Sequence, residues 1–265
     1  MAKKTPIEIN ICWPAISSTI RVMPISPRLI LSATGIAFAR WHHLSGSSRR
    51  DCPQGAKQMA ISPPPFKIIL GSSSVARRQI LLEMGYEFEI RTAGIDEKAI
   101  RKEKPEELVT VLAKAKADAI LSRLEITDYK DAEPTLLITS DIVVVHEGSI
   151  REKPTTQEEA RQFLKGYSGS HITTVNYVHV INLKTGKTTG GLDKAEVYFY
   201  QIPDEVIQNL IKEGIVFNVA GGLLLEHPLI LPLVEAVIGA SDSVMGLPKA
   251  LTEKLIQEAL TEEEF

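Results

Sequence analysis

Cysteine is scarce in this chain of 265 residues: Cys12 and Cys52 are the only two, and both lie near the N-terminus. The remaining sequence can therefore form neither an internal disulfide nor a cysteine-ligated zinc site. Such cysteine usage is typical of a reducing compartment, so we expect the protein in the cytoplasm.

Long uninterrupted apolar runs are also absent. The most apolar region, residues 223–240, is broken by two prolines, two glutamates and a histidine. A helix that crosses a bilayer needs about 20 consecutive, predominantly apolar residues. We therefore expect no membrane association.

Basic residues are in the minority over most of the chain. After residue 58 the sequence has 22 Lys and Arg against 31 Asp and Glu, whereas residues 1–58 have eight basic and two acidic residues. Binding of nucleic acid needs clustered Lys and Arg, and a broadly acidic surface repels phosphate backbones. We expect no nucleic-acid partner, and any phosphate ligand should be small and held in a locally basic pocket.

The first 58 residues differ in composition from the rest. They are basic, rich in serine, contain both tryptophans and show no amphipathic period. Two interpretations stay open: a disordered extension, or a transit peptide that would direct the protein to a chloroplast or a mitochondrion. In both cases we expect the folded domain at residues 59–265, with Met59 as an alternative start.

Strand and helix patterns alternate along the folded domain. Short β-branched or alternating runs predict strands, and apolar residues at helical spacing predict helices. Strands are expected at residues 66–70, 86–91, 136–145, 172–183 and 195–200. Helices are expected at residues 75–84, 105–124, 157–164, 203–213 and 249–260. This alternation predicts an α/β fold in which helices cover a central sheet.

A loop of small hydroxyl residues, 71–74, separates the first expected strand from the first helix, and Arg77 and Arg78 lie in the first helical turn. Backbone N–H groups at a helix N-terminus, serine hydroxyls and planar guanidinium groups suit a polyphosphate ligand. The segment lacks the Gly-Lys-Ser/Thr ending of a Walker A loop. The alternative is an ordinary serine N-cap followed by exposed arginines.

Asp141 is a carboxylate inside an otherwise apolar strand pattern, residues 136–145. A buried charge is costly unless it is paired or bound to a metal, so this position favours a functional carboxylate. The alternative is an acid that caps a turn at the end of a strand. The local sequence does not separate the two.

Three further polar residues are candidates for the same site. Glu97 belongs to an acidic pair in a loop, Lys116 lies on a helix where only one of two lysines can face inward, and Lys153 is near a turn. Each can equally be a solvated surface residue. The histidines after residue 58 have no metal-ligand spacing, and we assign none of them to catalysis.

Taken together and in this order, these segments resemble the Maf family of nucleotide pyrophosphatases. The similarity extends over about residues 68–260 and leaves the N-terminal extension outside. The matching motifs are residues 72–81, 95–97, 112–117, 140–144, 152–154, 167–171, 220–222 and 246–248. The resemblance implies an α/β fold of the Maf and ITPase-like type: a mixed central sheet flanked by helices, with two lobes around a deep cleft.

The resemblance also implies the chemistry and the site. The reaction would be hydrolysis of a nucleoside triphosphate to the monophosphate and pyrophosphate, with a divalent cation such as Mg²⁺, Mn²⁺ or Co²⁺. Asp141 would accept a proton, and Glu97 with Asp141 would bind the metal. The residues that would bind the substrate phosphates are Ser72, Ser74, Arg77, Arg78, Lys116 and Lys153. A homodimer is what the family suggests.

The sequence departs from the usual family pattern near the expected nucleobase pocket. We assign base specificity to Ala76, Ile142 and Glu226. Ile142 stands where Thr or Gln is common, and Glu226 stands where many members have Gln. A carboxylate accepts two hydrogen bonds from the Watson–Crick edge of guanine, and methylation at N7 adds positive charge to the ring. We therefore expect 7-methyl-GTP to be preferred over dTTP, UTP and CTP.

Two functional alternatives remain at this point. The first is an enzyme that removes non-canonical nucleotides. The second is a nucleotide-binding regulator of cell division that acts through partners without turnover, an activity also associated with the family. Glu226 itself has an alternative interpretation as a solvated loop acid beside His227.

Overall fold

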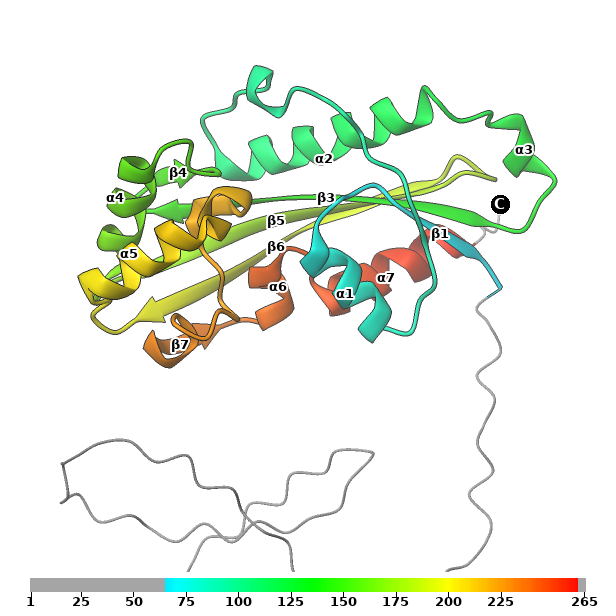
Figure 1. Cartoon of the computed structure of the whole chain (residues 1–265). Coiled ribbons are helices and arrows are strands. Elements are labelled where there is room, and N and C mark those ends of the chain that lie inside the picture. Colours follow the sequence, from blue (N-terminus) through cyan, green and yellow to red (C-terminus); the bar gives the residue numbers. More distant parts are fainter. Residues whose placement is uncertain (1–64, 262–265) are drawn as a thin grey trace, which may run out of the picture. The chain divides into compact units, whose positions relative to one another are not determined.

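A computed structural model describes residues 65–261 of the protein. The expectations for residues 1–58, and the boundary at residue 59, lie outside this range. Within it, the chain forms a single mixed sheet with helices on both faces (Figure 1). The predicted α/β class and mixed central sheet are confirmed, and the two-lobed cleft stays a prediction.

Seven strands build the sheet in the order β2-β1-β3-β5-β6-β7, with β4 paired to β3. Strand β1 runs parallel to β2 and β3, and the remaining pairs are antiparallel. The strands are β1 (Lys67–Leu70), β2 (Glu89–Ile90), β3 (Thr135–His146), β4 (Ser149–Arg151), β5 (His171–Asn182), β6 (Thr188–Phe199) and β7 (Val234–Ile238).

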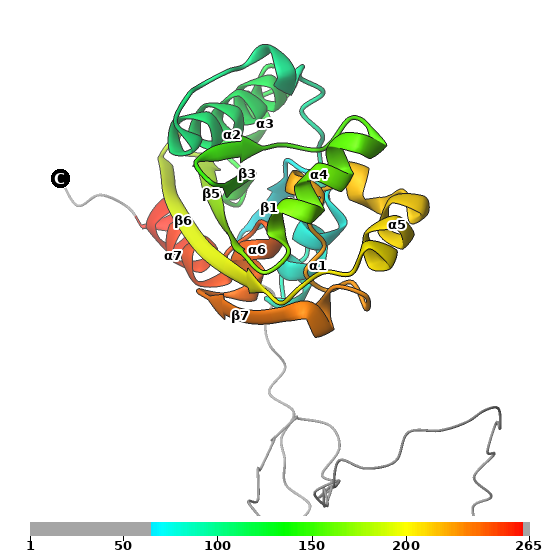
Figure 2. The same ribbon diagram turned by 90° about the vertical axis from the view of Figure 1, so that its left-hand side faces the viewer.

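Helix α2 packs on one face of the long strands β3 and β5, and α6 and α7 pack on β5 and β6 on the other face (Figures 1 and 2). Helices α4 and α5 pack against each other over a second part of the core. The helices are α1 (Val75–Glu83), α2 (Pro105–Leu121), α3 (Thr127–Lys130), α4 (Gln157–Tyr167), α5 (Asp204–Glu213), α6 (Ser241–Met245) and α7 (Lys249–Leu260).

The sequence explains why α2 covers the sheet. Pro105 opens the helix at its first turn, and Glu106 and Glu107 there complement the helix dipole. The inward stripe contains Leu112, Lys116 and Ile120, which are four residues apart and buried. One lysine is therefore carried into the interior by the hydrophobic face of the helix.

One edge of β3 is open at its centre. Strand β5 pairs with the other edge from Leu136 to Val145. On the open side, β1 pairs with β3 up to Ile138, and β4 pairs with it only from Val144 onward. Residues 139–143 therefore lie between two neighbouring strands without a pairing strand of their own, and Asp141 is at the middle of this gap.

Several elements differ from the sequence prediction. Strand β2 is only two residues long, and both residues are exposed. Strand β6 begins at Thr188 rather than at residue 195, while β4, β7 and the short helices α3 and α6 were not expected from the pattern. Four short 3₁₀ helices also occur: η1 (Glu97–Ala99), η2 (Ile215–Asn218), η3 (Ala220–Gly222) and η4 (Leu231–Leu233).

Candidate active site

The loop between β1 and α1 is organised by its own serines. Ser72 Oγ accepts a hydrogen bond from the backbone N–H of Ser74 at 3.2 Å, and Ser74 Oγ caps α1 by accepting from the N–H of Arg77 at 3.4 Å. A Cβ atom on Gly71 would lie 2.5 Å from Thr139 Cγ2 and 2.8 Å from Ile120 Cδ1. Glycine is therefore required for the loop to approach β3 this closely.

Arg77 is buried and points into the site. Its Nε donates to the carbonyl oxygen of Gly246 at 2.9 Å, and its Nη1 donates to Ser72 Oγ at 3.3 Å. Burial lowers the pKa of Arg77 from its ordinary value, and the negative charges of Asp141 and Glu97 partly offset this effect. Because Arg77 lies near these carboxylates, it belongs to one electrostatic cluster with them.

Arg78 has a different environment from Arg77. Its Nε donates to the carbonyl oxygen of Ser74 at 3.4 Å, and its Nη2 donates to that of Ser73 at 3.1 Å. The side chain thus braces the outer side of the serine loop. Of the two arginines, Arg77 is the one that the fold brings to the carboxylates.

A buried ion pair lies at the centre of the open edge of β3. Lys116 Nζ is 2.5 Å from Asp141 Oδ1 and 3.0 Å from Glu97 Oε1. The Lys116 and Asp141 residues are each 7% exposed. The structure therefore brings together three of the candidate residues, from α2, β3 and η1.

The two carboxylates of this cluster respond to their surroundings in opposite directions. Burial raises the pKa of Asp141, and it outweighs the lowering by the charges of Lys116 and Arg77. The pKa of Glu97 is lowered. Its partial burial would raise the pKa, but the charges of Lys116, Lys153 and Arg77 outweigh the burial. The surroundings therefore favour protonation of Asp141 and the ionised form of Glu97.

Lys153 lies at the rim of the cluster. Its side chain is exposed, and its charge contributes to the lowered pKa of Glu97, so the two groups are close enough to interact. The neighbouring Glu152 pairs with Arg101 at 3.6 Å. This ion pair connects the loop that carries Glu97 to the turn that carries Lys153.

The three residues assigned to base specificity take no part in the ion pairs of the cluster. Ala76 is half-buried in the first turn of α1, and half-buried Ile142 packs beside Gly246. Glu226 is exposed, and within residues 65–261 it makes no hydrogen bond or ion pair. Its neighbour His227 is instead paired with Glu213, through an Nε2 to Oε2 distance of 2.9 Å.

The residues that could hold a metal are Glu97 and Asp141. In the described part of the chain, no three His, Cys, Asp or Glu side chains form a group that could enclose an ion. A magnesium–nucleotide complex needs fewer protein ligands, because Mg²⁺ is commonly bound by one or two carboxylates together with the substrate phosphates. The donor set therefore fits a cation that arrives with a nucleotide.

Two residues of the site had no role in the sequence interpretation. Ser140 Oγ donates to the carbonyl oxygen of Gly246 at 3.0 Å, the same oxygen that accepts from Arg77. Gly246 ends α6 with a φ of +97°, which favours glycine. The motifs at residues 140–144 and 246–248 contain both, but nothing in their spacing indicated that they meet.

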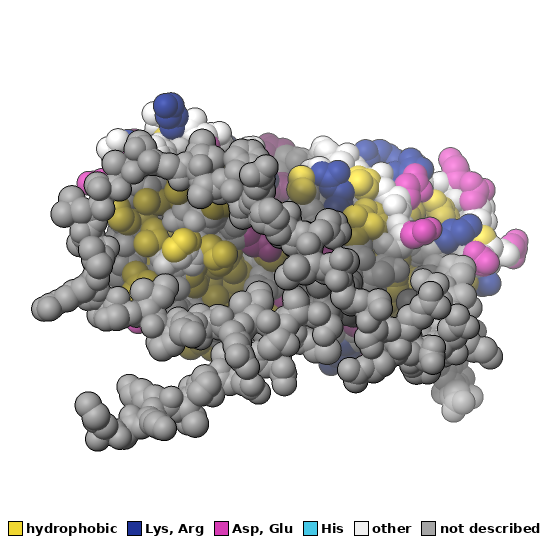
Figure 3. Space-filling view, turned by 60° about the horizontal axis from the view of Figure 1, so that its bottom comes forward, with side chains coloured by type: hydrophobic (Ala, Val, Ile, Leu, Met, Phe, Trp, Pro, Cys, Tyr) yellow, Lys and Arg dark blue, Asp and Glu magenta, His cyan; other side chains and the backbone are white. Residues whose placement is uncertain are grey.

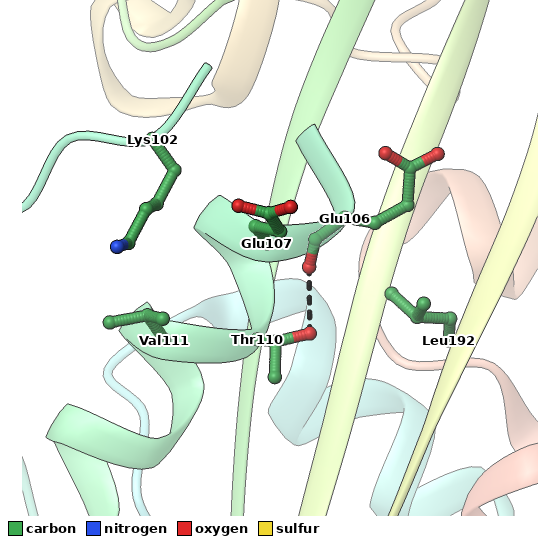
Figure 4. Close-up of a pocket in the computed structure, with 6 residues that line it drawn as sticks. All are labelled: Lys102, Glu106, Glu107, Thr110, Val111 and Leu192. Carbon is green, nitrogen blue, oxygen red and sulfur yellow. Dashed lines mark hydrogen bonds between the residues drawn. The ribbon is translucent and has the colours of Figure 1, made fainter. Parts of the chain in front are cut away.

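A shallow hollow of about 330 Å³ lies elsewhere, between the N-terminal half of α2 and β6 (Figure 4). It is lined by Lys102, Glu106, Glu107, Thr110, Val111 and Leu192. None of the residues assigned to the candidate site lines this hollow. Its walls combine surface charges with two apolar side chains, so it does not provide the phosphate-binding groups described above.

Comparison with known proteins places the chain in a family. Residues 67–259 match the family model described as Maf-like protein. The chain is 42% identical to a 7-methyl-GTP pyrophosphatase of Dictyostelium discoideum, over 72% of this chain and 96% of that protein. A 7-methyl-GTP pyrophosphatase of Nitrosococcus oceani is 30% identical, over 75% of this chain and 96% of that protein.

A relative with a different substrate name is also similar. The dTTP/UTP pyrophosphatase of Caldicellulosiruptor saccharolyticus is 33% identical, over 72% of this chain and 94% of that protein. The family match and these identities show that the chain belongs to the Maf-like protein family. Among residues 65–261, no helix is long and apolar enough to span a bilayer.

Proposed function

We propose that this protein is a nucleoside triphosphate pyrophosphatase that prefers 7-methyl-GTP and releases the monophosphate and pyrophosphate. The observation that carries the proposal is the meeting of Asp141, Lys116 and Arg77 at the open edge of β3. A buried carboxylate flanked by cations is suited to activating water beside a polyanionic substrate. The names of the relatives support the same reaction.

The phosphate chain would lie along the basic side of the site. Arg77 and Ser72 offer directed donors beside the N-terminus of α1, and Lys116 and Lys153 supply positive charge. Ser74 and Arg78 extend the same loop toward solvent. Aligned donors and fixed cations stabilise the charge that accumulates on a leaving pyrophosphate.

Asp141 would act as the proton acceptor. A water molecule attacks the α-phosphorus, its proton passes to the Asp141 carboxylate, and the bond between the α-phosphorus and the bridging oxygen breaks, so that pyrophosphate leaves. The raised pKa of Asp141 favours this role, because a more basic carboxylate accepts a proton more readily. Lys116 holds the carboxylate in place through its 2.5 Å contact.

Glu97 and Asp141 would bind a divalent cation, Mg²⁺, Mn²⁺ or Co²⁺, that accompanies the nucleotide. Such a cation neutralises phosphate charge and polarises the phosphoryl oxygens. Lys116 contacts both carboxylates, so a bound cation would add a second positive charge beside the Lys116 ammonium group.

Glu226 would select the base. It is exposed and free of partners within the described chain, so its carboxylate is available to the donors of a guanine edge. The 42% identity to the 7-methyl-GTP pyrophosphatase of Dictyostelium discoideum, against 33% to the dTTP/UTP pyrophosphatase of Caldicellulosiruptor saccharolyticus, supports this preference. Ala76 and Ile142 would shape the apolar part of the base pocket.

The assembly and location are further parts of the proposal. Hydrophobic side chains gather at the end of the molecule that carries β7 (Figure 3), where Leu231 and Ile238 are 58% and 59% exposed. This apolar end and its edge strand are suited to a homodimer contact. We propose a cytoplasmic enzyme that removes non-canonical nucleotides, or one in a chloroplast or mitochondrion if residues 1–58 are a transit peptide.

The test is a substrate panel on two forms of the protein. We expect the wild type to have its highest kcat/KM with 7-methyl-GTP among 7-methyl-GTP, dTTP, UTP and CTP. Glu226→Gln should reduce that preference by about 1–3 kcal/mol, the scale of a lost charged hydrogen bond. Glu205→Gln, at an exposed position on α5, is the matched control and should leave the substrate preference unchanged.

The outcomes separate the parts of the proposal. A wild-type preference for dTTP or UTP overturns the base assignment and leaves the pyrophosphatase reaction standing. Binding of nucleotide without release of pyrophosphate from any of the four would instead favour the regulator of cell division.

A further inference from the structure

Gly221 holds the segment that carries Glu226, residues 219–226, to the rest of the site through two hydrogen bonds. Its backbone N–H donates to the carbonyl oxygen of Glu152 at 2.9 Å, and its own carbonyl oxygen accepts from the Tyr167 hydroxyl at 2.9 Å. Glu152 precedes Lys153. Gly221 therefore connects the expected base-binding segment to the expected phosphate-binding turn.

Gly221 also rests directly on the strand that carries Asp141. It has a φ of +62°, and a Cβ atom there would lie 2.7 Å from Cβ of Val144 and 2.9 Å from the Tyr167 hydroxyl. Val144 is three residues beyond Asp141 on β3. The contact leaves no room for the segment to shift toward the strand, so the hydrogen bonds on its other sides set its position.

The ring of Tyr167 is held rigidly. Tyr167 is fully buried, its ring meets that of His146 edge-on at 5.3 Å, and it stacks with Phe199 at 6.2 Å. Gly166 lies against the same histidine ring, which leaves His146 little freedom. Burial raises the pKa of Tyr167, so the hydroxyl remains a donor over the working pH range.

We propose that Tyr167 is a positioning residue for substrate specificity: its hydroxyl fixes Gly221 and so sets where the base is held relative to Asp141. This inference rests on the proposed function. It concerns a residue at the end of α4 that is not among those assigned to phosphate or base binding. Tyr167 acts through Gly221, which ties the base-binding segment to the turn of Lys153 and to β3.

The test removes the hydroxyl alone. In Tyr167→Phe the carbonyl oxygen of Gly221 loses its side-chain donor in a buried place, so the segment should loosen while the ring packing stays. We expect KM for the preferred nucleotide to rise and its advantage over the poorest nucleotide to fall, each by at least about threefold, with kcat changed less than about twofold. Inhibition by inorganic triphosphate, which has no base, should be unchanged.

Two further measurements make the outcomes distinct. Amide hydrogen exchange in residues 219–226 should accelerate in Tyr167→Phe and not in Tyr200→Phe, a matched variant at a residue that is 53% exposed. Faster exchange with unchanged discrimination between nucleotides, or no faster exchange, overturns the positioning role alone. A wild type that hydrolyses no nucleoside triphosphate overturns the proposed function, and the positioning role with it.

Discussion

Lys116 joins the two carboxylates of the site, and the two carboxylates lie in different environments. Asp141 is buried on β3 with a raised pKa, whereas Glu97 lies in a partly exposed loop with a lowered pKa. A proton acceptor benefits from the first environment and a metal ligand from the second, because a ligand must stay ionised. The raised pKa of Asp141 therefore supports its proposed role as proton acceptor, and the lowered pKa of Glu97 supports its proposed role as a metal ligand.

Substitution of Asp141 by Asn should abolish turnover. The change keeps the shape of the side chain but removes the proton acceptor, so kcat should fall at least about 100-fold, the scale of a positioned general base. Steady-state pyrophosphate release measures the loss, and circular dichroism checks the fold. Asp128→Asn, at an exposed position on α3, serves as the control. Near-normal release from a folded Asp141→Asn protein would remove Asp141 from the mechanism.

His179 should make the stability of the protein sensitive to acid. Burial lowers its pKa, only partly offset by the hydrogen bond to the carbonyl oxygen of Thr189. The unfolded chain, with a histidine pKa of about 6.5, then binds a proton more readily than the folded one, so stability falls as the pH drops below that value.

The measurement for His179 is urea unfolding between pH 7.5 and about pH 5, below the unfolded histidine pKa. His179→Gln should flatten the loss of unfolding free energy over that range, while His171→Gln, at an exposed position, should leave the slope as in the wild type. If the unfolding free energy falls equally with pH in all three proteins, His179 does not contribute to the acid sensitivity of the fold.

At the scale of elements, the sequence patterns located most of the sheet and its helices. The strand pattern of residues 172–183 and the apolar stripe of α2 predicted elements that the structure contains, and the strand–loop–helix unit around residues 66–84 was found almost as expected. Amphipathic period is a strong signal because it reports which side chains face the core. The same period explains why Lys116, and not exposed Lys114, reaches Asp141.

The missed elements depend on contacts far apart in the sequence. The first half of β6 is polar and contains Gly190 and Gly191, which argue against a strand in isolation. Tyr177 of β5 covers Gly190: a Cβ atom there would collide with its hydroxyl. The backbone pairing with β5 along nearly the whole of β6 stabilises a strand that the local sequence does not favour. β7 is likewise a short edge strand, defined by its pairing with β6.

The site was only partly predictable for the same reason. Asp141 could be named from its apolar strand, and Glu97 and Lys116 gained their roles through the family resemblance, but the meeting of the three depends on the gap between β1 and β4. That gap is a property of strand pairing. The roles of Gly246 and Tyr167 arise from a carbonyl oxygen and a hydroxyl that meet partners more than fifty residues away, and no local pattern encodes such contacts.

The approach of the serine loop to β3 can be tested at Gly71. Replacement by Ala places a methyl group against Thr139, Ile120 and the carbonyl oxygen of Ile138. We expect the free energy of unfolding to fall by about 1–3 kcal/mol, as for an overpacked core, and kcat/KM to fall because the loop that carries Ser72 must move. Gly85→Ala, with open space around it, should leave kcat/KM unchanged.

A Gly71→Ala protein with wild-type stability and activity would contradict this account of the loop. Gly85 has a positive φ of its own, so its variant also shows what backbone strain alone costs. The comparison therefore separates the steric effect at Gly71 from a general effect of adding a methyl group.

At the scale of the whole molecule, the family match begins at residue 67. We expect residues 1–58 to be dispensable for catalysis, because every candidate site residue lies beyond them. A protein that starts at Met59 should keep kcat/KM within about threefold of the full chain, a difference below roughly 0.7 kcal/mol. If this shorter protein folds but is inactive, the expected domain boundary is wrong.

The central claim is that Asp141 directs water to the α-phosphorus, and isotope labelling tests it most directly. Turnover of the preferred nucleoside triphosphate in water enriched in ¹⁸O, with the products separated and analysed by mass spectrometry, shows which phosphorus receives the oxygen. We expect the label in the nucleoside monophosphate, with unlabelled pyrophosphate, and no label incorporation by Asp141→Asn. Label in pyrophosphate, or release of a nucleoside diphosphate and inorganic phosphate, would contradict the account.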